Sequence, residues 1–263
     1  MKILSIDTSG QQATAAIIND YIIIGEITLN AKTGEKSWTH SEILMPGVEA
    51  LFKLTAMDIN EMDYIAYGAG PGSFTGLRIG ASTALGLANG INKPTIAVPT
   101  LDLLAYNMLG AKSLGLVVPM LDARRAQVYA AIYQTSATGQ LAATTSYMAL
   151  PVEELLAMVD SQMTQDQTLQ QNSPAPVFLG DGADAYQENI RAKIPQAIFV
   201  APNNNRQRGA SLALCALEKI KNGYQAPKEV EMLYVRAPQA VQDKINKEMK
   251  AATDNERKEN ERK

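Results

Sequence analysis

The stretch Gly68–Gly80, GAGPGSFTGLRIG, is the most informative part of this sequence for predicting the fold, because it holds five glycines and one proline. The segment before it, Asp63–Tyr67, is short and mostly apolar, which predicts a buried strand. The segment after it has the small-residue spacing of a helix, with Ser73 or Thr75 as the N-cap. The sequence therefore predicts a strand, a tight loop and a helix in immediate succession.

This loop does not match either of two common phosphate-binding patterns. A P-loop requires G-x-x-x-x-G-K-[ST], and the stretch contains no lysine. A dinucleotide loop requires G-x-G-x-x-G, but its third glycine would fall on Ser73 or on Thr75. A free helix N-terminus can still hold an anion, so these mismatches leave anion binding open.

The predicted helix carries a row of small residues, Gly76, Gly80, Ala84 and Ala88, which are spaced by four and share one face. Glycine inside a helix costs about 0.5–1 kcal/mol relative to alanine. Such a row is typical of a place where another backbone comes close. Periodicity does not tell whether that backbone belongs to the same domain or to a second subunit, and both remain open.

The composition excludes several classes of protein. The chain has 263 residues, 46% of them hydrophobic, and a net charge of −3, which argues against a nucleic-acid binder that works alone. A single cysteine, Cys215, rules out an internal disulfide framework, and a single histidine, His40, rules out a two-histidine metal site. No apolar run approaches the ~18 residues of a membrane span, and no signal-peptide pattern is visible. We therefore expect a cytoplasmic protein without membrane contact.

Apolar periodicity predicts the remaining elements. Pro46 lies inside one helical pattern, where it favours an irregular first turn, and Thr39 or Ser37 is the expected cap of that helix. The expected strands are Lys2–Asp7, Ala13–Ile18, Tyr21–Leu29, Thr95–Val98 and Val177–Gly182, the last ending in a turn. The expected helices are Ser41–Leu54, Thr100–Leu109 and Gly209–Ile220. The expected irregular segments are the loop Asp160–Pro176, the extended segment Pro227–Arg236 and a polar tail from Lys244.

Two segments of the chain align without a gap. Ile6–Ile17 and Leu121–Ile132 each read as an apolar strand that ends in aspartate, then a turn, then a second strand. Asp7 aligns with Asp122, and the Ala-Ala-Ile that ends each segment is identical. The repeated pattern predicts a duplicated domain with a strand-Asp-hairpin at the head of each half.

A duplicated fold with such hairpins resembles the actin-like ATPase superfamily, in which the two hairpins grip the phosphates of ATP. The resemblance implies an α/β, ribonuclease H-like fold of two subdomains, each a mixed sheet flanked by helices. It also implies glycines where the backbone meets phosphate, yet Ala123–Ala126 fills the second turn without one. The nucleotide site is therefore predicted to be vestigial, and its two aspartates either bind a metal-nucleotide or cap their turns. Its candidate residues are Asp7, Thr8, Ser9, Asp122, Gly180, Asp181 and Gly182.

No catalytic constellation is complete in this sequence. A Ser-His-Asp triad would have to use His40, and no G-x-S-x-G nucleophile elbow is present. Cys215 has no cationic or histidine neighbour in sequence to activate it. We predict neither a catalytic residue nor a metal ligand, which also argues against a metalloprotease.

Four motifs together resemble the TsaB family, also called YeaZ. They are Gly70–Gly80, Ile6–Ser9, Leu121–Arg125 and Gly180–Ala183, and the resemblance runs from Met1 to about Arg236. It implies a non-catalytic scaffold or dimerisation subunit that pairs with the related catalytic subunit, TsaD, and works with a TsaE-type ATPase. This complex transfers threonylcarbamoyl to N6 of adenosine 37 in tRNA, the t6A modification. The alternative is a stand-alone ATP-binding phosphotransferase or ATPase of the actin-like class.

The family resemblance also implies where partners and ligands bind. The partner contact is a helix bundle made by the first two helices, which match Ser41–Leu54 and Thr75–Asn89. The same surface implies a homodimer when the chain is alone. No cofactor is required by this chain, ATP or ADP binds only at the partner junction, and tRNA contact is indirect or minor. The candidate interface residues are Ile43, Leu44, Val48, Leu51, Phe74, Gly76, Leu77, Arg78, Gly80, Ala81, Ala84 and Leu85.

The predicted organisation has four parts. Residues 1–110 form an N-terminal subdomain that carries the partner interface, and residues 111–205 form a second actin-like subdomain. Residues 206–236 form a helix and a strand that pack back on the body. Residues 237–263 form a charged tail.

Overall fold

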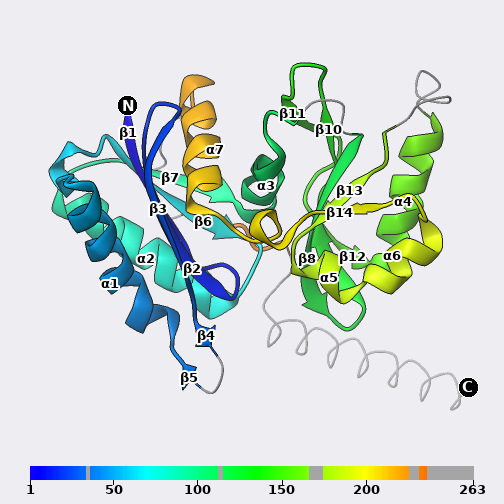
Figure 1. The fold of residues 1–263 in the computed structure, drawn as a ribbon, viewed down its shortest axis with the longest axis horizontal. Coiled ribbons are helices and arrows are strands. Elements are labelled where there is room, and N and C mark those ends of the chain that lie inside the picture. The colour runs from blue at the N-terminus through cyan, green and yellow to red at the C-terminus, as the bar shows by residue number, and fades with distance from the viewer. Residues whose placement is uncertain (34–35, 112–114, 166–173, 225–230, 236–263) are drawn as a thin grey trace, which may run out of the picture. The chain divides into compact units, whose positions relative to one another are not determined.

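The computed structural model describes residues 1–33, 36–111, 115–165, 174–224 and 231–235 (Figure 1). The chain divides into one compact unit, Met1–Leu233, and a second unit, Tyr234–Lys263. All helices and strands assigned in the described residues lie in the first unit. The subdomain boundaries at residues 110 and 205 stay predictions, and the predicted tail 237–263 lies outside the described residues.

The first half of the chain builds a five-stranded sheet in the order β3-β2-β1-β6-β7. Strand β1 pairs antiparallel with β2 and parallel with β6, which in turn pairs parallel with β7. These strands are β1 (Lys2–Asp7), β2 (Gln12–Asn19), β3 (Ile22–Asn30), β6 (Tyr64–Gly70) and β7 (Thr95–Pro99). A separate short ladder joins β4 (Lys32–Thr33) to β5 (Lys36–Ser37).

Three helices cover the two faces of this sheet (Figure 1). On one face lie α1 (His40–Thr55) and α2 (Phe74–Gly90), whose apolar residues share a core with Leu4, Ile6 and Ile65. On the other face lies α7 (Gly209–Lys221), which packs on Ile3 and Ile18. Both faces of the central strands are therefore buried, as their nearly unbroken apolar sequence predicts.

The caps of α1 and α2 agree with the sequence. Thr39 caps α1 in a capping box, because its backbone N–H donates to Oε2 of Glu42 at 2.6 Å. Ser73 caps α2, and its hydroxyl accepts from the backbone N–H of Gly76 at 3.2 Å. Helix α1 is assigned without a break through Pro46, so the irregular first turn expected there is not seen.

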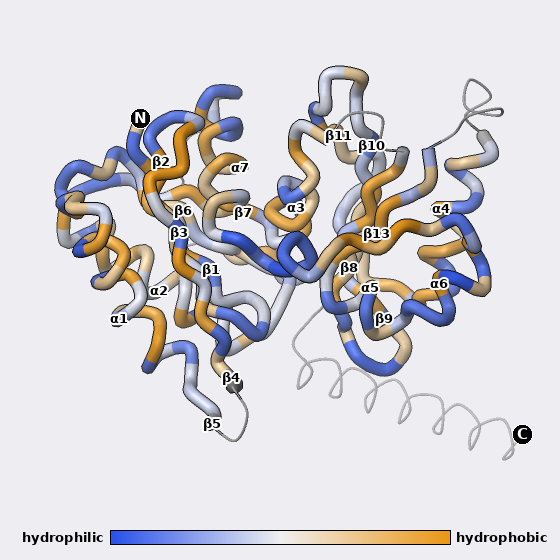
Figure 2. The backbone as a smooth tube through the Cα atoms, viewed as in Figure 1, coloured by the Kyte–Doolittle hydropathy of each residue, from blue (hydrophilic) through white to orange (hydrophobic). Residues whose placement is uncertain are grey.

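The second half repeats the arrangement of the first. Strand β8 (Leu116–Arg124) pairs antiparallel with β9 (Gln127–Ala130) and parallel with β13 (Val177–Leu179), which pairs parallel with β14 (Ile198–Phe199). Strand β13 is among the segments coloured most hydrophobic in Figure 2. Further strands are β10 (Tyr133–Thr135), β11 (Leu141–Ala143) and β12 (Met148–Pro151). The helices are α3 (Thr100–Ala105), α4 (Val152–Gln165), α5 (Asp181–Ala185) and α6 (Gln187–Lys193), with 3₁₀ turns at Ile59–Glu61, Tyr106–Met108 and Pro202–Asn204.

This topology confirms the predicted α/β fold with an internal duplication. In each half an antiparallel hairpin leads into two parallel strands, and the order β3-β2-β1-β6-β7 is matched by β12-β9-β8-β13-β14. Asp7 and Asp122 occupy equivalent places, near the carboxyl end of the first strand of each hairpin. The fold belongs to the actin-like class.

The structure differs from the sequence-based expectations at three places in the second half and near the C-terminus. The loop expected at Asp160–Pro176 is wrong up to Gln165, because α4 continues to that residue. The helix expected over Thr100–Leu109 ends at Ala105 and is followed by a 3₁₀ turn. The extended segment expected at Pro227–Arg236 lies outside the described residues except at 231–235, where no strand is assigned.

Among the described residues, no helix combines the length and the apolar character that crossing a membrane requires. The longest described helix, α2, instead buries one face in the core and leaves Arg78 and other polar residues exposed. It has the pattern of an amphipathic surface helix.

Candidate functional site

The glycines of the stretch 68–80 lie against the turn between β1 and β2. A Cβ atom added at Gly68 would stand 1.9 Å from Oδ1 of Asp7, and one at Gly72 would stand 2.5 Å from the carbonyl oxygen of Ser9. A Cβ at Gly76 would stand 2.0 Å from the carbonyl oxygen of Thr8. Contacts below 3.0 Å are sterically forbidden, so these positions exclude any side chain.

Hydrogen bonds fix the same contact between the loop and the turn. The backbone N–H of Ser73 donates to the carbonyl of Ser9 at 2.7 Å, and the hydroxyl of Thr8 donates to the carbonyl of Gly76 at 2.6 Å. On its other side the loop accepts a bond at 2.8 Å from the N–H of Leu233 to the carbonyl of Ala69. The glycine-rich loop is therefore an internal junction between segments of the same chain.

The small-residue row of α2 turns out to pack within its own domain. Gly76 and Gly80 lie directly on Thr8, and Ala84 and Ala88 belong to the core between α2 and the sheet. The backbone that approaches this row is thus the β1–β2 turn, one of the two alternatives that the spacing left open. A bulky residue at Gly80 would act on the fold of the single chain.

Burial corrects most of the predicted partner interface. A buried side chain that already fills the chain's own core is not available to a partner surface. The buried candidates are Leu44, Val48, Leu51, Gly76, Leu77, Gly80, Ala81 and Ala84. Ile43 and Leu85 are half-buried, and Phe74 and Arg78 are exposed. Periodicity located the two helices; most of the candidates lie on their inner faces, whereas Phe74 and Arg78 lie on the outer face.

The outer face of α2 offers a different surface. Phe74 is 44% exposed, and the guanidinium of Arg78 stacks over its ring at 3.8 Å. A shallow hollow of about 440 Å³ lies on this face. It is lined by Phe74, Thr75, Arg78, Ile79, Ser82 and Thr83. On α1, Met45 is exposed as well. Phe74, Arg78 and Ser82 are spaced by four, on the side of the helix opposite the small residues. This spacing in the sequence already indicates an outer face.

A second and larger cleft, about 740 Å³, opens between the two halves of the duplication. One wall comes from the β1–β2 turn, the segment before α1 and the start of α2, and the other comes from the β8–β9 hairpin and α5. Its lining comprises Ser9, Gly10, Gln11, Ala31, Ser37, His40, Gly72, Ser73, Leu121, Asp122, Ala123, Arg124, Tyr129 and Asp181. Among the predicted nucleotide residues, only Ser9, Asp122 and Asp181 reach this cleft.

Asp7 and Thr8 do not line the cleft, because the chain's own loop covers them. Asp7 is 1% exposed, and its Oδ2 accepts from the N–H and the hydroxyl of Ser9 at 3.2 and 2.9 Å. Its Oδ1 has no hydrogen-bond partner. Burial raises the pKa of this carboxyl from 3.8 to about 6, and the two bonds from Ser9 only partly offset that effect. The glycine-rich loop of the same chain therefore lies directly against this carboxyl.

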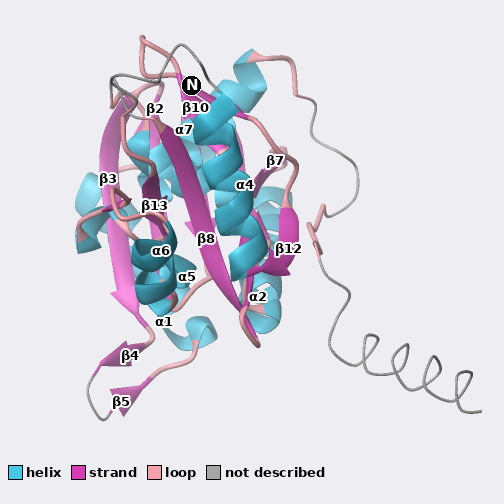
Figure 3. Cartoon of the chain, turned by 90° about the vertical axis from the view of Figure 1, so that its right-hand side faces the viewer, coloured by secondary structure: helices cyan, strands magenta, loops and turns pink. Residues whose placement is uncertain are grey.

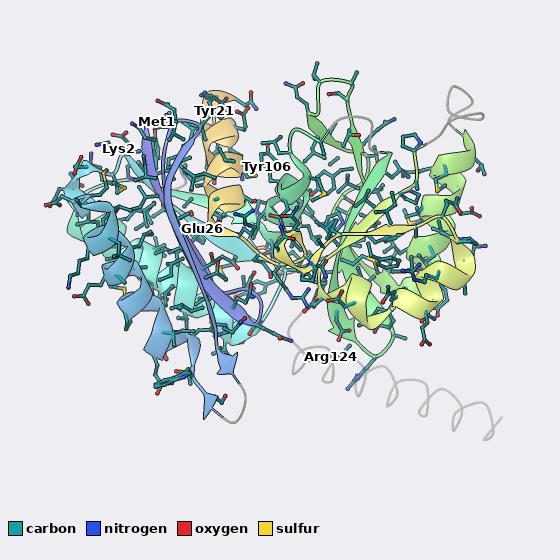
Figure 4. All side chains as sticks on the ribbon, in the orientation of Figure 1. Met1, Lys2, Tyr21, Glu26, Tyr106 and Arg124 are labelled. Atoms are coloured by element: carbon teal, nitrogen blue, oxygen red, sulfur yellow. The ribbon has the colours of Figure 1, made fainter. Side chains whose placement is uncertain are left out.

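The second hairpin is open where the first is filled. The turn Arg124–Ala126 has positive φ angles of 65°, 55° and 56° at three consecutive non-glycine residues. Asp122 caps this turn by accepting from the N–H of Arg124 at 2.8 Å and pairing with its guanidinium at 3.1 Å. Arg124 points away from the body at the tip of the hairpin (Figure 4). Asp122 was predicted either to bind a metal-nucleotide or to cap its turn, and its contacts in the structure are those of a turn cap.

The glycines after β13 also pack against protein. Gly180 has a φ of +98°, and a Cβ there would stand 2.1 Å from the carbonyl oxygen of Met120. A Cβ at Gly182 would stand 3.0 Å from the backbone of β8 at Met120 and Leu121. Between them, Asp181 accepts from the N–H of Asp122 at 3.0 Å, and burial raises its pKa. These glycines therefore serve the packing of α5 on β8 and leave no phosphate cradle.

In the part of the chain that the structure describes, no group of three or more His, Cys, Asp or Glu side chains is placed to hold an ion. His40 lies at the first turn of α1, on the wall of the cleft, and burial lowers its pKa. Cys215 is buried in α7, which raises the pKa of its thiol and makes it a core residue, as expected.

The fold and this site together define a class: an actin-like chain whose first hairpin is covered by its own glycine-rich loop. The family model described as "TsaD: tRNA N6-adenosine threonylcarbamoyltransferase" matches residues 24–253, and the chain belongs to this family.

Individual relatives confirm the predicted resemblance to TsaB. The chain is 35% identical over 139 residues to the "tRNA threonylcarbamoyladenosine biosynthesis protein TsaB" of Escherichia coli, which covers 53% of this chain and 58% of that protein. It is 38% identical over 134 residues to the protein of the same description from Bacillus subtilis, which covers 51% and 56%. The matched stretch thus spans a little over half the length of these relatives.

A solved structure described as "YeaZ from Pseudomonas aeruginosa" matches the fold. The TM-score is 0.67 at 23% identity, and the match covers 89% of this chain and 99% of that one. At this identity the likeness shows the fold alone.

Proposed function

We propose that this chain is a non-catalytic partner subunit in the biosynthesis of threonylcarbamoyladenosine on tRNA. It would pair with a TsaD-type subunit that carries the chemistry of transferring threonylcarbamoyl to N6 of adenosine 37. Family membership and the similarity to TsaB proteins support the pathway.

The observation that carries the non-catalytic role is the closed first hairpin. An actin-like enzyme needs its first aspartate and the following turn to be open to metal-bound phosphate. In this chain Asp7 and Thr8 are buried beneath Gly68, Gly76 and Gly80, at distances that leave no room for a ligand. We propose that this chain requires no cofactor, and that ATP or ADP binds only at the junction with the partner.

We place the partner surface on the outer faces of α1 and α2. On α2 the ring of Phe74 is exposed and carries the stacked guanidinium of Arg78, and on α1 Met45 is exposed. Aromatic side chains, methionine and arginine are the residue types enriched in protein interfaces. The same surface would support a homodimer when the partner is absent.

Other parts of the proposal follow from the pathway. A TsaE-type ATPase would join the pair, contact with tRNA by this chain would be indirect or minor, and the protein would act in the cytoplasm. The net charge of −3 is consistent with a minor role in RNA binding.

The test is light scattering on a sizing column with the full chain alone and mixed with a TsaD-type subunit. We expect a stable mixed species that Phe74→Glu weakens at least about tenfold, because the substitution buries a charge in the contact. The matched control is Ile198→Glu, since Ile198 is 47% exposed on β14 in the other half of the chain. Absence of a mixed species, together with ATP hydrolysis by the chain alone that Asp7→Ala abolishes, would instead favour the stand-alone ATPase.

A further inference from the structure

Strand β3 is the terminal strand of the first sheet, since β2 is its only neighbour in the sheet order. Figure 3 shows it at the outer margin of that sheet. The outer edge of such a strand presents unpaired backbone N–H and C=O groups, which form a template for another strand. In the described part of the chain, no strand pairs with this edge.

The beginning of β3 is apolar, and Ile22, Ile23 and Ile24 are 67%, 46% and 39% exposed. Tyr21, just before the strand, is 56% exposed and contacts α7, because Lys221 lies over its ring at 4.0 Å and its hydroxyl donates to Glu218 at 2.5 Å. Further along, the strand is covered, because Gly25 lies against Leu51 and Thr55 of α1 and Ile27 packs on the core.

The three consecutive isoleucines do not alternate with polar residues. A half-exposed strand normally alternates, whereas an unbroken apolar run is typical of a strand covered on both faces. The sequence therefore corresponds to a covered strand at a place where the single chain provides no cover.

Most of the sequence features that normally prevent an exposed strand edge from pairing with another chain do not occur in this strand. Residues 21–30 contain no lysine and no proline, and their only charge is Glu26. Glu26 faces inward, where it accepts from Arg208 at 2.5 Å and from the N–H of Ala210 at 3.0 Å. Asp20, which precedes the run, pairs with the N-terminal amino group at 3.1 Å. One defence remains, a β-bulge at Ile24, where the register with β2 shifts.

We infer that this edge pairs with a second copy of the chain, antiparallel and about a two-fold axis at Ile22. In this register Ile22 faces Ile22 of the other copy, Tyr21 faces Ile23, and Asp20 faces Ile24. No like charges meet, and the same segment supplies both halves of an isologous contact. Two five-stranded sheets would then join into one.

The surface area that this contact can bury limits its affinity. Four partly exposed side chains bury less than the ~800 Å² per partner of a standard interface, so the association is weak, with a dissociation constant in the micromolar range or above. This edge is separate from the outer face of α2, and the inference does not depend on the proposed function. A chain that used both surfaces would form assemblies larger than a dimer.

The experiment is sedimentation of the full chain over a range of concentrations in a Phe74→Glu background, which removes pairing through α2. We expect a monomer–dimer equilibrium whose dissociation constant Ile22→Lys raises at least about tenfold, because an edge lysine opposes strand pairing. Hydrogen exchange of the amides at residues 22–26 should slow as the dimer forms. The matched control is Leu54→Lys, a similar change at the 83%-exposed Leu54 on the last turn of α1.

Three results would overturn the inference. One is a monomer at all concentrations up to several hundred micromolar, well above the expected association range. Another is a dimer that Ile22→Lys and Leu54→Lys weaken equally, which would indicate general surface stickiness. The third is a dimer in which the amides of residues 22–26 exchange as fast as in the monomer, which would place the contact elsewhere.

Discussion

The two hairpins β1–β2 and β8–β9 occupy equivalent places in the duplication, yet they differ in what meets them. At the first hairpin, Asp7 and Thr8 are buried beneath the glycines of residues 68–80, and Oδ1 of the aspartate lacks a hydrogen-bond partner. The turn of the second hairpin is exposed, its aspartate has partners on both oxygens, and three residues adopt left-handed backbone. Of the two duplicated motifs, the first is thus a packing element of the core and the second lies at the surface.

The substitution with the largest expected effect on stability is one that disrupts the packing of the first hairpin. We expect Gly76→Ala to lower the free energy of unfolding by about 3 kcal/mol or more, because the new Cβ meets a backbone oxygen that cannot move away. Urea denaturation of the full chain measures it. The control is Gly86→Ala in the same helix, where nothing lies within 4 Å. It should gain about 0.5–1 kcal/mol. Equal stability of the Gly76→Ala variant and the wild type would show that the loop does not pack as described.

A smaller effect tests the buried carboxyl of the same hairpin. The pKa of Asp7 is raised from 3.8 to about 6 by burial, so the folded state holds a proton that the unfolded chain releases. The stability that Asp7 contributes is complete below about pH 3.8 and is lost as the pH rises through about 6. Over this window we expect the unfolding free energy of the wild type to fall relative to Asp7→Asn by roughly 2–3 kcal/mol.

Urea denaturation of both proteins at a series of pH values measures this difference. Taking the difference removes the other titrating groups, which the two proteins share. A difference that stays constant with pH would mean that Asp7 titrates normally and is open to solvent.

The smallest effect concerns the open hairpin. We expect Arg125→Gly to raise the unfolding free energy by about 0.5–1 kcal/mol, because glycine tolerates a positive φ without strain. The control in the first hairpin is Gln11→Gly, where the backbone is not left-handed. That change should instead cost about 0.5–1 kcal/mol through the entropy of the unfolded chain. Thermal unfolding compares the two, and a loss of stability in Arg125→Gly would argue that the arginine side chain holds the turn.

The sequence predicts this fold well where local patterns decide it. Strand β1, the caps Thr39 and Ser73 and the duplication all follow from spacing and from residue type. The burial of the row from Gly76 to Ala88 does not, because spacing marks a close approach without naming the segment that approaches. That segment is Thr8, far away in the sequence, and only the folded chain brings it there.

The second half shows a different kind of omission. Val152, Leu155, Leu156 and Val159 have helical spacing and are buried in the core of that half. This signal for α4 was present in the sequence, but the glutamines and serines that follow it favoured a loop. The exposed Phe74 and Arg78 lie on the same helix as the buried small residues. Which face of this helix is free for a partner can be told only once the position of the sheet is known.

The return of α7 to the first sheet has a consequence for synthesis on the ribosome. Helix α7 covers Ile3 and Ile18, and Leu233 closes on Ala69 next to the glycine-rich loop. The first half therefore cannot complete its core when it leaves the ribosome, although it is made first. One apolar face of the first sheet therefore stays exposed until the second half and α7 have been translated. A chain that stopped before Gly209 would expose that face, so the two halves of this duplication are no longer independent folding units.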